Sequence, residues 1–378
     1  MKKKEIQLTT LTNPTAFIDN SALINNLRLI KEINKYSKIF PVVKANAYGH
    51  GIDIVSKAIS SFVDGYAVAR LDEALELRAI IPQKPILVMS AASIDGIQNY
   101  HSQNIIPIIH NKKQLKNIVK KTNGLWFKVD TGMHRLGMSI EDLKEIIDDY
   151  DDITIMSHFH SAQRENLIPN IDQLKYLFNN INIDTSNHQL SWDNSSTILQ
   201  SKSNNYDSNL RENNIFRNMK NEILRPGIML YGVDPLNRPN SESKKLIQVM
   251  NLCAPILSIR KIKKGESVGY NQTWMSNKTS FIATIGIGYG DGYPRNIKKN
   301  TPILIRGKKA FIVGEVSMDT LCVDVSHLIE SGHEIDVGET ATLWGDGLNI
   351  SEIASNANTI AYELLSRLMP RVKRVLVD

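Results

Sequence analysis

The sequence predicts an α/β fold: a parallel (β/α)8 barrel followed by a mostly antiparallel β domain. Between residues 38 and 232, eight short apolar runs alternate with stretches in which apolar residues recur every three or four positions. Beyond residue 250, β-branched runs are separated by Gly-containing turns. The 378 residues exceed what one hydrophobic core usually holds, so a large domain and a smaller one are expected.

The eight apolar runs are the expected barrel strands. Eight strands that are each followed by a helix are typical of a closed parallel barrel, and this count argues against an open doubly wound sheet. The runs are IFPVVKA, GYAVAR, PILVMS, IIPIIH, LWFKVD, ITIMSHF, HQLSWDN and EILRPGIMLYG. Helices are expected at GIDIVSKAIS, DEALELRAI, KKQLKNIVKK, SIEDLKEIIDDY and DQLKYLFNN.

The second domain is predicted from a change of character after the polar segment LNRPNSESKK, which we interpret as a linker. We place the barrel at residues 14–238 and the β domain at residues 239–378, with residues 1–13 packed on the β domain. The early strand AFID is not needed to complete the barrel and is expected to pair with the C-terminal domain. The expected strands are LCAPILSIRKI, SFIATIGIGYG, TPILIRGKKAFIVGEV, LCVDVSHL and TATLWG, with a closing helix at NISEIASNANTIAYELLSRL.

One stretch fits neither pattern. Residues 201–221 are rich in Asn, Ser and Lys and contain few apolar residues. This composition predicts a surface insertion.

Composition limits the function classes. The net charge is +6, but the 45 basic residues are scattered among 39 acidic ones, which argues against a nucleic-acid surface. Two cysteines, Cys253 and Cys322, form neither a disulfide framework nor a structural zinc site on their own. The basic start is not followed by an apolar run of signal-peptide length, and no run is long enough to span a bilayer. We therefore expect a soluble cytoplasmic protein that binds neither membrane nor nucleic acid.

Lys44 ends the first barrel strand, at the edge where barrels of this kind carry their sites. Burying an ammonium group is costly, whereas a lysine that forms a Schiff base with an aldehyde cofactor avoids that cost. Position alone supports this hypothesis and its alternative equally well. In the alternative, Lys44 extends into solvent at the barrel rim. Tyr48 follows at a distance suited to the same pocket, and Gly49 and Gly51 allow a tight turn.

The octapeptide KANAYGHG, residues 44–51, resembles the cofactor-lysine motif of alanine racemases. Further matches extend to Tyr362, so the resemblance covers nearly the whole chain. It implies a fold-type III enzyme that uses pyridoxal 5′-phosphate to interconvert L- and D-alanine and that supplies D-alanine for peptidoglycan. It also implies a homodimer with two shared active sites, in which the two catalytic bases are Lys44 and Tyr270 of the partner subunit.

The resemblance assigns further barrel residues to the cofactor. LRPGIMLYG is similar to the strand whose arginine, here Arg225, faces the pyridine nitrogen, and His158 matches a histidine that stacks on the ring and bonds that arginine. A metal site at His158 and His160 is the alternative, which no carboxylate or cysteine at ligand spacing supports. Asn194 and Ser195 are also ordinary helix caps. The implied cofactor set is Lys44, Tyr48, His158, Asn194, Ser195, Arg225, Gly227, Ile228 and Tyr362.

The substrate residues follow from two further segments. KVDTGMHRLGM resembles the segment with a substrate-facing arginine, here Arg135, and Lys128 matches a lysine that many relatives carbamylate. A carbamate would replace the repulsion between Lys128 and Arg135 with attraction, whereas a neutral or outward-pointing Lys128 is the alternative. In the β domain the resemblance assigns Met318 and Asp319 to the substrate carboxylate and Tyr289 and Arg295 to an access corridor.

Three other functions share parts of this pattern. A fold-type III decarboxylase would place an acidic residue where Arg225 stands. A broad-specificity racemase would be expected to carry a signal peptide and usually a disulfide. A pyridoxal-phosphate carrier protein, which is a binding module, lacks a second domain. Arg225 also belongs to the expected mechanism, because a chain from Tyr270 through His158 to this cation would favour the phenolate.

Overall fold

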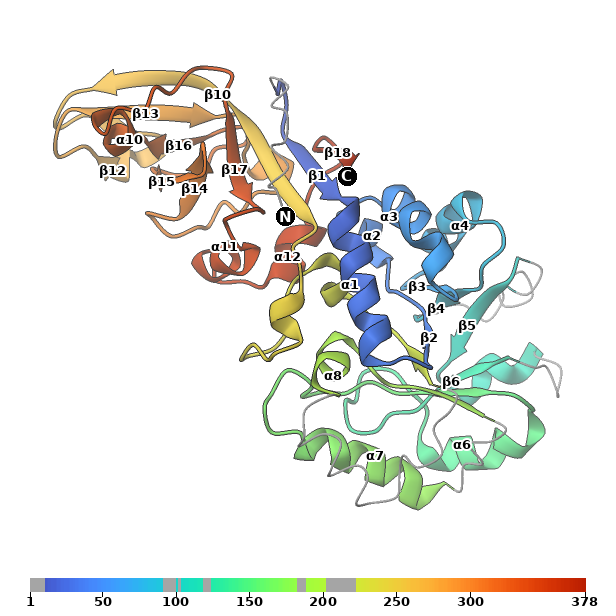
Figure 1. Ribbon diagram of the computed structural model, residues 1–378. Helices are drawn as coiled ribbons and strands as arrows, with labels where there is room; N and C mark the ends of the chain where they lie inside the picture. The colour runs from blue at the N-terminus through green and yellow to red at the C-terminus, as the bar shows by residue number, and fades with distance from the viewer. Residues whose placement is uncertain (1–10, 91–99, 101–102, 118–123, 182–187, 202–221) are drawn as a thin grey trace. The chain divides into compact units, whose positions relative to one another are not determined.

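The computed structural model describes residues 11–90, 100, 103–117, 124–181, 188–201 and 222–378 (Figure 1). They form two compact units. We call Ala22–Ile247 the barrel unit, and we call the residues up to Ser21 together with Gln248–Asp378 the β unit. Most of the predicted insertion, residues 202–221, lies outside the described residues, and so do residues 1–10. No helix in the described ranges is long and apolar enough to cross a membrane.

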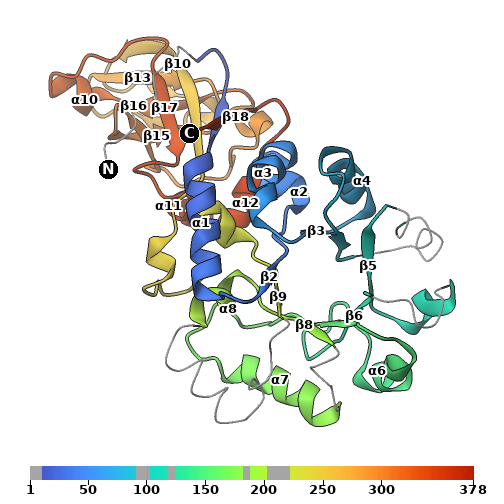
Figure 2. The same cartoon turned by 45° about the vertical axis from the view of Figure 1, so that its right-hand side comes forward.

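The barrel unit contains a closed ring of parallel strands (Figure 2). Six strands pair in the order β3-β4-β5-β6-β7-β8, and β2 pairs with β9. Single parallel bridges, Val42 with Ala67 and Leu190 with Glu222, join β2 to β3 and β8 to β9. The predicted eight-stranded barrel is therefore confirmed. Its strands are β2 (Lys38–Ile39), β3 (Tyr66–Val68), β4 (Ile86–Val88), β5 (Ile105–Ile109), β6 (Trp126–Lys128), β7 (Thr154–Met156), β8 (Gln189–Ser191) and β9 (Ile223–Leu224).

Most residues of these strands are apolar because a parallel barrel buries both faces of its sheet. All three residues of β4, for example, are 0% exposed. The helices of the unit are α1 (Asn20–Ile33), α2 (Lys44–Tyr48), α3 (Ile52–Ile59), α4 (Leu71–Ile80), α6 (Ile140–Ile146), α7 (Ile168–Asn180) and α8 (Ser195–Gln200).

One predicted helix is different in the structure. Within KKQLKNIVKK, residues Lys112–Asn117 form a 3-10 helix, and the rest lies outside the described residues. The Gln114 side chain accepts hydrogen bonds from the backbone N–H groups of His110 and Asn111 at 2.8 and 3.1 Å. These bonds tie the segment to the preceding strand end in a tight turn, which the apolar spacing alone did not indicate.

The β unit contains an antiparallel ring. Its strands run in the order β13-β16-β15-β14-β17-β10, and β13 also pairs with β10. The early strand β1 (Thr15–Asp19) pairs with β10 and, in parallel, with β18, so its predicted pairing with the C-terminal segment is confirmed. The other strands are β10 (Met250–Ile262), β11 (Ser267–Val268), β12 (Trp274–Met275), β13 (Ser280–Ile285), β14 (Pro302–Ile305), β15 (Lys308–Val313), β16 (Leu321–Asp324), β17 (Thr340–Trp344) and β18 (Lys373–Val377).

The end of the chain departs from the prediction. The expected single helix is two helices, α11 (Ile350–Asn356) and α12 (Ala361–Ser366), and a strand, β18, closes the chain. Asn358 has a φ of 53°, a left-handed conformation that ends a right-handed helix. The β-branched Thr359 and Ile360, which disfavour a helix, follow it. The helical spacing of apolar residues in the sequence therefore continues across a position where the helix itself is interrupted.

Candidate active site

The segment that follows β2 is a left-handed turn. Ala45, Asn46, Ala47 and Tyr48 have φ values between 50° and 53°, and Gly49 continues the turn with a φ of 77°. A left-handed conformation costs a residue with a side chain about 1–2 kcal/mol, so the surrounding structure must hold this turn in place. The tight turn predicted from the glycines is present, but it begins at Ala45, before either glycine.

Several side chains hold this turn. The His50 Nδ1 lies 2.9 Å from the Tyr48 carbonyl oxygen. The Asn46 side chain accepts a hydrogen bond from the backbone N–H of Ile52 at 2.7 Å. The Glu73 carboxylate of α4 accepts one from the backbone N–H of Ala45, also at 2.7 Å. Lys44 therefore directly precedes a strained turn that is fixed at both ends.

The Lys44 amine lies in a cationic and largely buried environment. Burial lowers its pKa, and the charges of Arg135 and Arg225 lower it further, while the Glu73 carboxylate opposes them. A neutral amine is the form that attacks an aldehyde carbon. The environment therefore favours the reactive form of Lys44.

A second group of polar atoms surrounds Gly227. The Ser195 Oγ, at the start of α8, accepts hydrogen bonds from the backbone N–H groups of Gly227 and Met229 at 2.9 and 3.3 Å. A Cβ atom on Gly227 would lie 2.8 Å from the Tyr48 Oη and 3.8 Å from the Ser195 Oγ. Two hydroxyls and a run of backbone N–H groups around a position with no side chain form a cradle suited to a phosphate.

Two members of the predicted cofactor set lie beside this cradle. Ile228 begins the 3-10 helix Ile228–Tyr231, directly after Gly227. The Asn194 side chain accepts hydrogen bonds from the backbone N–H groups of Ser196 and Thr197 at 2.9 and 3.3 Å. In this structure Asn194 is thus the N-cap of α8, which is one of the two interpretations that its sequence position allowed.

Arg225 follows β9 and is 4% exposed. Its Nε donates to the Ser191 Oγ at 2.9 Å, and its Nη2 donates to the Ser157 carbonyl at 2.7 Å. Burial lowers its pKa to about 10, while Asp193 opposes that shift, so the guanidinium stays charged at neutral pH. Within the described ranges, Nη1 makes no hydrogen bond to protein and is left for another acceptor.

His158 follows β7 and is held in its neutral form. Burial lowers its pKa to about 3, and the charges of Arg225, Arg135, Lys128 and Lys44 add to the shift. The hydrogen bond predicted between His158 and Arg225 is not among those of the described residues. Arg225 uses its Nε and Nη2 on serines instead.

Lys128 ends β6 and is 6% exposed. Burial lowers its pKa to about 8, and Arg225 and Arg135 contribute in the same direction. The loop after it carries Arg135 and is organised by Asp130, whose carboxylate accepts the backbone N–H groups of Gly132 and His134, both at 3.0 Å. Arg135 itself is exposed. Because Lys128 is buried, the alternative in which its side chain points outward into solvent is wrong.

With this geometry in view, comparisons with known proteins identify the family. The N-terminal domain of alanine racemases matches residues 18–235, and their C-terminal domain matches residues 249–376. The chain belongs to the alanine racemase family.

Individual relatives agree with this assignment. The alanine racemase of Mannheimia succiniciproducens is 39% identical over 96% of this chain and 99% of its own length. The alanine racemase of Vesicomyosocius okutanii is 40% identical over 94% of this chain and 96% of its own length. The crystal structure of the biosynthetic alanine racemase from Pseudomonas aeruginosa has a TM-score of 0.85 and 34% identity, covering 97% of this chain and 100% of that one.

Most of the predicted alanine racemase residues of the β unit lie on connecting segments, and Tyr362 lies in a helix. Tyr270 begins a 3-10 turn, Tyr270–Gln272, and is 67% exposed. Tyr289 and Met318 belong to two loops that pair: the Tyr289 N–H donates to the Ser317 carbonyl at 3.1 Å, and the Gly290 N–H to the Met318 carbonyl at 2.8 Å. Arg295 and Tyr362 do not belong to this loop pair. Arg295 pairs with Glu315 at 3.4 Å, and Tyr362 lies in α12.

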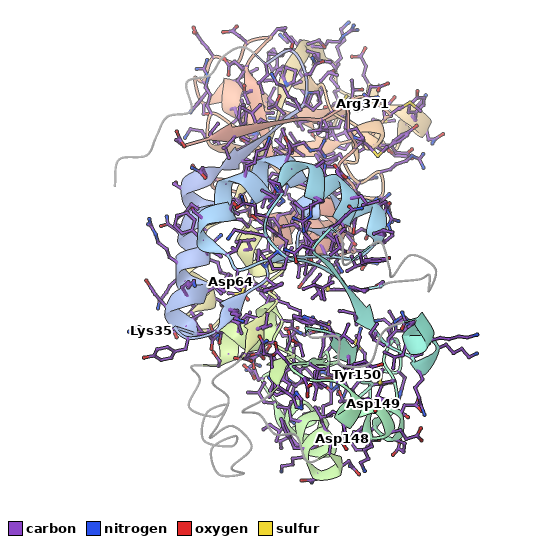
Figure 3. The ribbon with its side chains drawn as sticks, turned by 90° about the vertical axis from the view of Figure 1, so that its right-hand side faces the viewer. Lys35, Asp64, Asp148, Asp149, Tyr150 and Arg371 are labelled. Atoms are coloured by element: carbon purple, nitrogen blue, oxygen red, sulfur yellow. The ribbon has the colours of Figure 1, made fainter. Side chains whose placement is uncertain are left out.

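A residue that the sequence did not indicate joins these two loops. Arg371, labelled in Figure 3, donates from Nε to Asp291 at 2.6 Å and from Nη2 to Asp319 at 2.5 Å. Three further residues of the site, Ser157, Ser191 and Glu73, were not predicted from the sequence either. Of these, only Glu73 carries a local signal, because an acidic residue at the third helical position often caps its own helix.

Proposed function

We propose that this chain racemises alanine by a two-base mechanism, with pyridoxal 5′-phosphate held in the barrel unit. The convergence of the Lys44 turn, the Gly227 cradle and the buried Arg225 at one end of a parallel barrel carries the proposal. Membership of the alanine racemase family supports the reaction, and a relative from Bartonella henselae, with a TM-score of 0.82 and 27% identity, is a structure with covalently bound pyridoxal phosphate.

The residues of the barrel unit fit this cofactor. The Lys44 amine, whose pKa is lowered by burial, would bind its aldehyde carbon. Tyr48, Ser195 and the backbone N–H groups of Gly227 and Ile228 would hold the phosphate, because Gly227 leaves room for an anion where a Cβ would fill the cradle. Tyr362 of the β unit is proposed as a further phosphate ligand.

Arg225 determines the character of the site. When bound, the cofactor delocalises the negative charge that develops at the substrate Cα and so makes that carbon more acidic. With a pKa of about 10, the Arg225 guanidinium keeps its protons at neutral pH. Its Nη1 can donate a hydrogen bond to a ring nitrogen without transferring the proton. A decarboxylase-type site would have a carboxylate here, so Arg225 favours racemisation.

Lys44 is the proposed base on one face of the substrate, and Tyr270 of the partner subunit is the proposed base on the other. A free phenol has a pKa of about 10, so a tyrosine base needs positive charge nearby to act at neutral pH. The barrel unit supplies this charge through Arg225 and Arg135, while His158 stays neutral and is free to relay a hydrogen bond. Because the two proposed bases come from different subunits, the proposed active form is a homodimer with shared sites.

Arg135, with Met318 and Asp319 of the partner subunit, is proposed to bind the substrate carboxylate. Lys128 has the lowered pKa that carbamylation requires, because the neutral amine is the form that reacts with carbon dioxide. The carbamate would then pair with Arg135. D-Alanine made in the cytoplasm would serve peptidoglycan synthesis.

A direct assay tests the function. The purified chain, loaded with pyridoxal 5′-phosphate, is incubated separately with L-alanine, L-serine and L-lysine, and the enantiomers and the corresponding amines are separated. We expect D-alanine as the main product, little D-lysine and no ethylamine from alanine. Equal rates on all three amino acids would support a broad-specificity racemase. Release of amines would support a decarboxylase.

A further inference from the structure

The two oxygens of the Glu73 carboxylate contact two different elements of the barrel unit. Oε2 accepts hydrogen bonds from the backbone N–H groups of Ala69 and Arg70, at 2.8 and 3.1 Å, just before α4. Oε1 accepts the backbone N–H of Ala45 at 2.7 Å. One side chain therefore caps its own helix and also reaches the turn that carries Lys44.

The turn has a reason to need this second contact. Within the turn, the N–H groups of Ala47 and Gly49 donate to the carbonyls of Val43 and Ala45, at 2.9 and 3.0 Å. The first N–H groups of any helical turn have no earlier carbonyl to bind. Glu73 supplies an acceptor for one of them at Ala45, directly after the lysine.

Strain makes this contact more consequential than an ordinary cap. Four successive residues with side chains, Ala45 to Tyr48, are in the left-handed region. Such a conformation persists only where neighbouring groups define it fully. The Asn46 side chain fixes the far end of the turn through Ile52, and Glu73 fixes the near end.

We propose that Glu73 is a positioning residue that holds the left-handed turn and thereby aims Lys44 and Tyr48 at the cofactor. The effect of this orientation on catalysis rests on the proposed function. The hydrogen bond between Glu73 and Ala45 does not depend on it. The carboxylate also acts on the amine through charge, because it opposes the lowering of the Lys44 pKa by burial and by the two arginines.

The test compares Glu73→Ala and Glu73→Gln with Glu76→Gln, a matched control on an exposed position of the same helix. Amide hydrogen exchange is measured by mass spectrometry on the full chain, with and without pyridoxal 5′-phosphate. In Glu73→Ala we expect exchange at residues 45–49 to rise by about tenfold or more in both forms. Glu73→Gln, which keeps one acceptor oxygen, should fall between this variant and the parent, and Glu76→Gln should match the parent.

Steady-state kinetics on alanine give the second readout. Because the lysine is misaimed rather than lost, we expect Glu73→Ala to lower kcat by about tenfold or more, with a much smaller change in KM. Faster exchange in α4 alone, with residues 45–49 unchanged, would show that Glu73 only caps its own helix and would overturn the proposal. If Glu73→Ala does not fold, exchange in Glu73→Gln decides in the same way.

The two proposals fail separately. If the parent protein does not racemise alanine, the proposed function is wrong, but the exchange comparison at residues 45–49 still tests Glu73. If the parent racemises alanine and Glu73→Ala exchanges and turns over as the parent does, only the role of Glu73 is wrong.

Discussion

The Ser195 hydroxyl oxygen lies 2.9 Å from the backbone nitrogen of Gly227 and accepts its hydrogen bond. A bound phosphate would take over that N–H group and would in turn accept the hydroxyl proton. Ser195 therefore exchanges the role of acceptor for that of donor when an anion enters. The residue matters to the site in both states.

Replacing Ser195 with Ala should weaken cofactor binding. A hydrogen bond to a charged group contributes about 1.5–3 kcal/mol, so the dissociation constant for pyridoxal 5′-phosphate should rise by about tenfold or more. Equilibrium dialysis of the cofactor-free protein measures it. Ser196→Ala, at the next residue and also buried, is the control and should bind as the parent does. Equal affinities for the two variants would place the phosphate elsewhere.

Replacing Arg225 with Glu should change the outcome of the reaction as well as its rate. A carboxylate would favour a protonated ring nitrogen, where Arg225 donates without giving up its proton. We expect racemisation to slow by about tenfold or more, since one pKa unit of tuning corresponds to about 1.4 kcal/mol. Transamination should rise relative to racemisation.

The measurement is the ratio of pyruvate to D-alanine formed from L-alanine. Arg225→Lys is the control, because it keeps the charge although it loses the paired contacts to Ser157 and Ser191. Parental rates and no added pyruvate in Arg225→Glu would mean that Arg225 does not face the ring nitrogen.

The lowered pKa of His158 should make the free energy of unfolding depend on pH under acidic conditions. Its folded pKa is about 3, against 6.5 in an unfolded chain. Between these values the unfolded chain binds a proton that the folded chain does not, so the free energy of unfolding falls as the pH is lowered through this window. His158→Gln should remove this contribution, which amounts to about 1 kcal/mol per pH unit.

Urea unfolding of cofactor-free protein between pH 7 and pH 5 measures the slope. His160→Gln is a matched control, because His160 lies two residues further on and is exposed. A His158→Gln slope as steep as the parental one would contradict the lowered pKa.

Lys128 should form a carbamate in the folded protein. With a pKa of about 8, roughly half of its amines are neutral at pH 8, against under about 1% for an ordinary lysine. NMR with carbon-13 bicarbonate should show a carbamate signal in the parent that is absent from Lys128→Met. Lys112→Met, which removes a partly exposed lysine paired with Asp142 and Glu145, should keep the signal.

Stability gives an independent check of the Lys128 pKa. Without bicarbonate, the unfolded chain keeps the lysine proton between about pH 8 and 10.5, while the folded chain has lost it. The stability of the parent relative to Lys128→Met should therefore rise with pH across this window. A constant difference would indicate an ordinary lysine pKa.

The proposed homodimer predicts complementation between two inactive variants. Lys44→Ala lacks one base and Tyr270→Ala lacks the other, but a mixed dimer with shared sites would contain one complete site. Mixing the two proteins under subunit exchange should restore activity in about half of the sites of each mixed dimer. Two copies of one variant, mixed in the same way, are the control. No recovery after exchange is confirmed by mass would contradict shared sites.

The sequence predicted the barrel because most of its strands are buried on both faces and so appear as largely apolar runs. It failed where local polar contacts override apolar spacing, as at Gln114 and at Asn358. It also missed β18, a five-residue strand of mixed charged and apolar residues that is ordered by pairing with β1.

The site was predictable in part for a related reason. The motif around Lys44 is contiguous, so its residues are visible together in the sequence. The contact of Glu73 with Ala45 spans 28 residues, and the bond of Arg371 to Asp291 spans 80. No local pattern reports such contacts, because they depend on which strand ends the fold brings side by side.

The pairing of β1 with β10 and β18 has a consequence for synthesis on the ribosome. β1 is made first, yet both of its partner strands follow the whole of Ala22–Ile247. At about 5–20 residues per second, β1 waits for roughly tens of seconds before a neighbour emerges. During that time Ala16 and Ile18, which are fully buried in the finished protein, have no strand to cover them. The nascent chain can therefore pair β1 only after the whole of Ala22–Ile247 has been made.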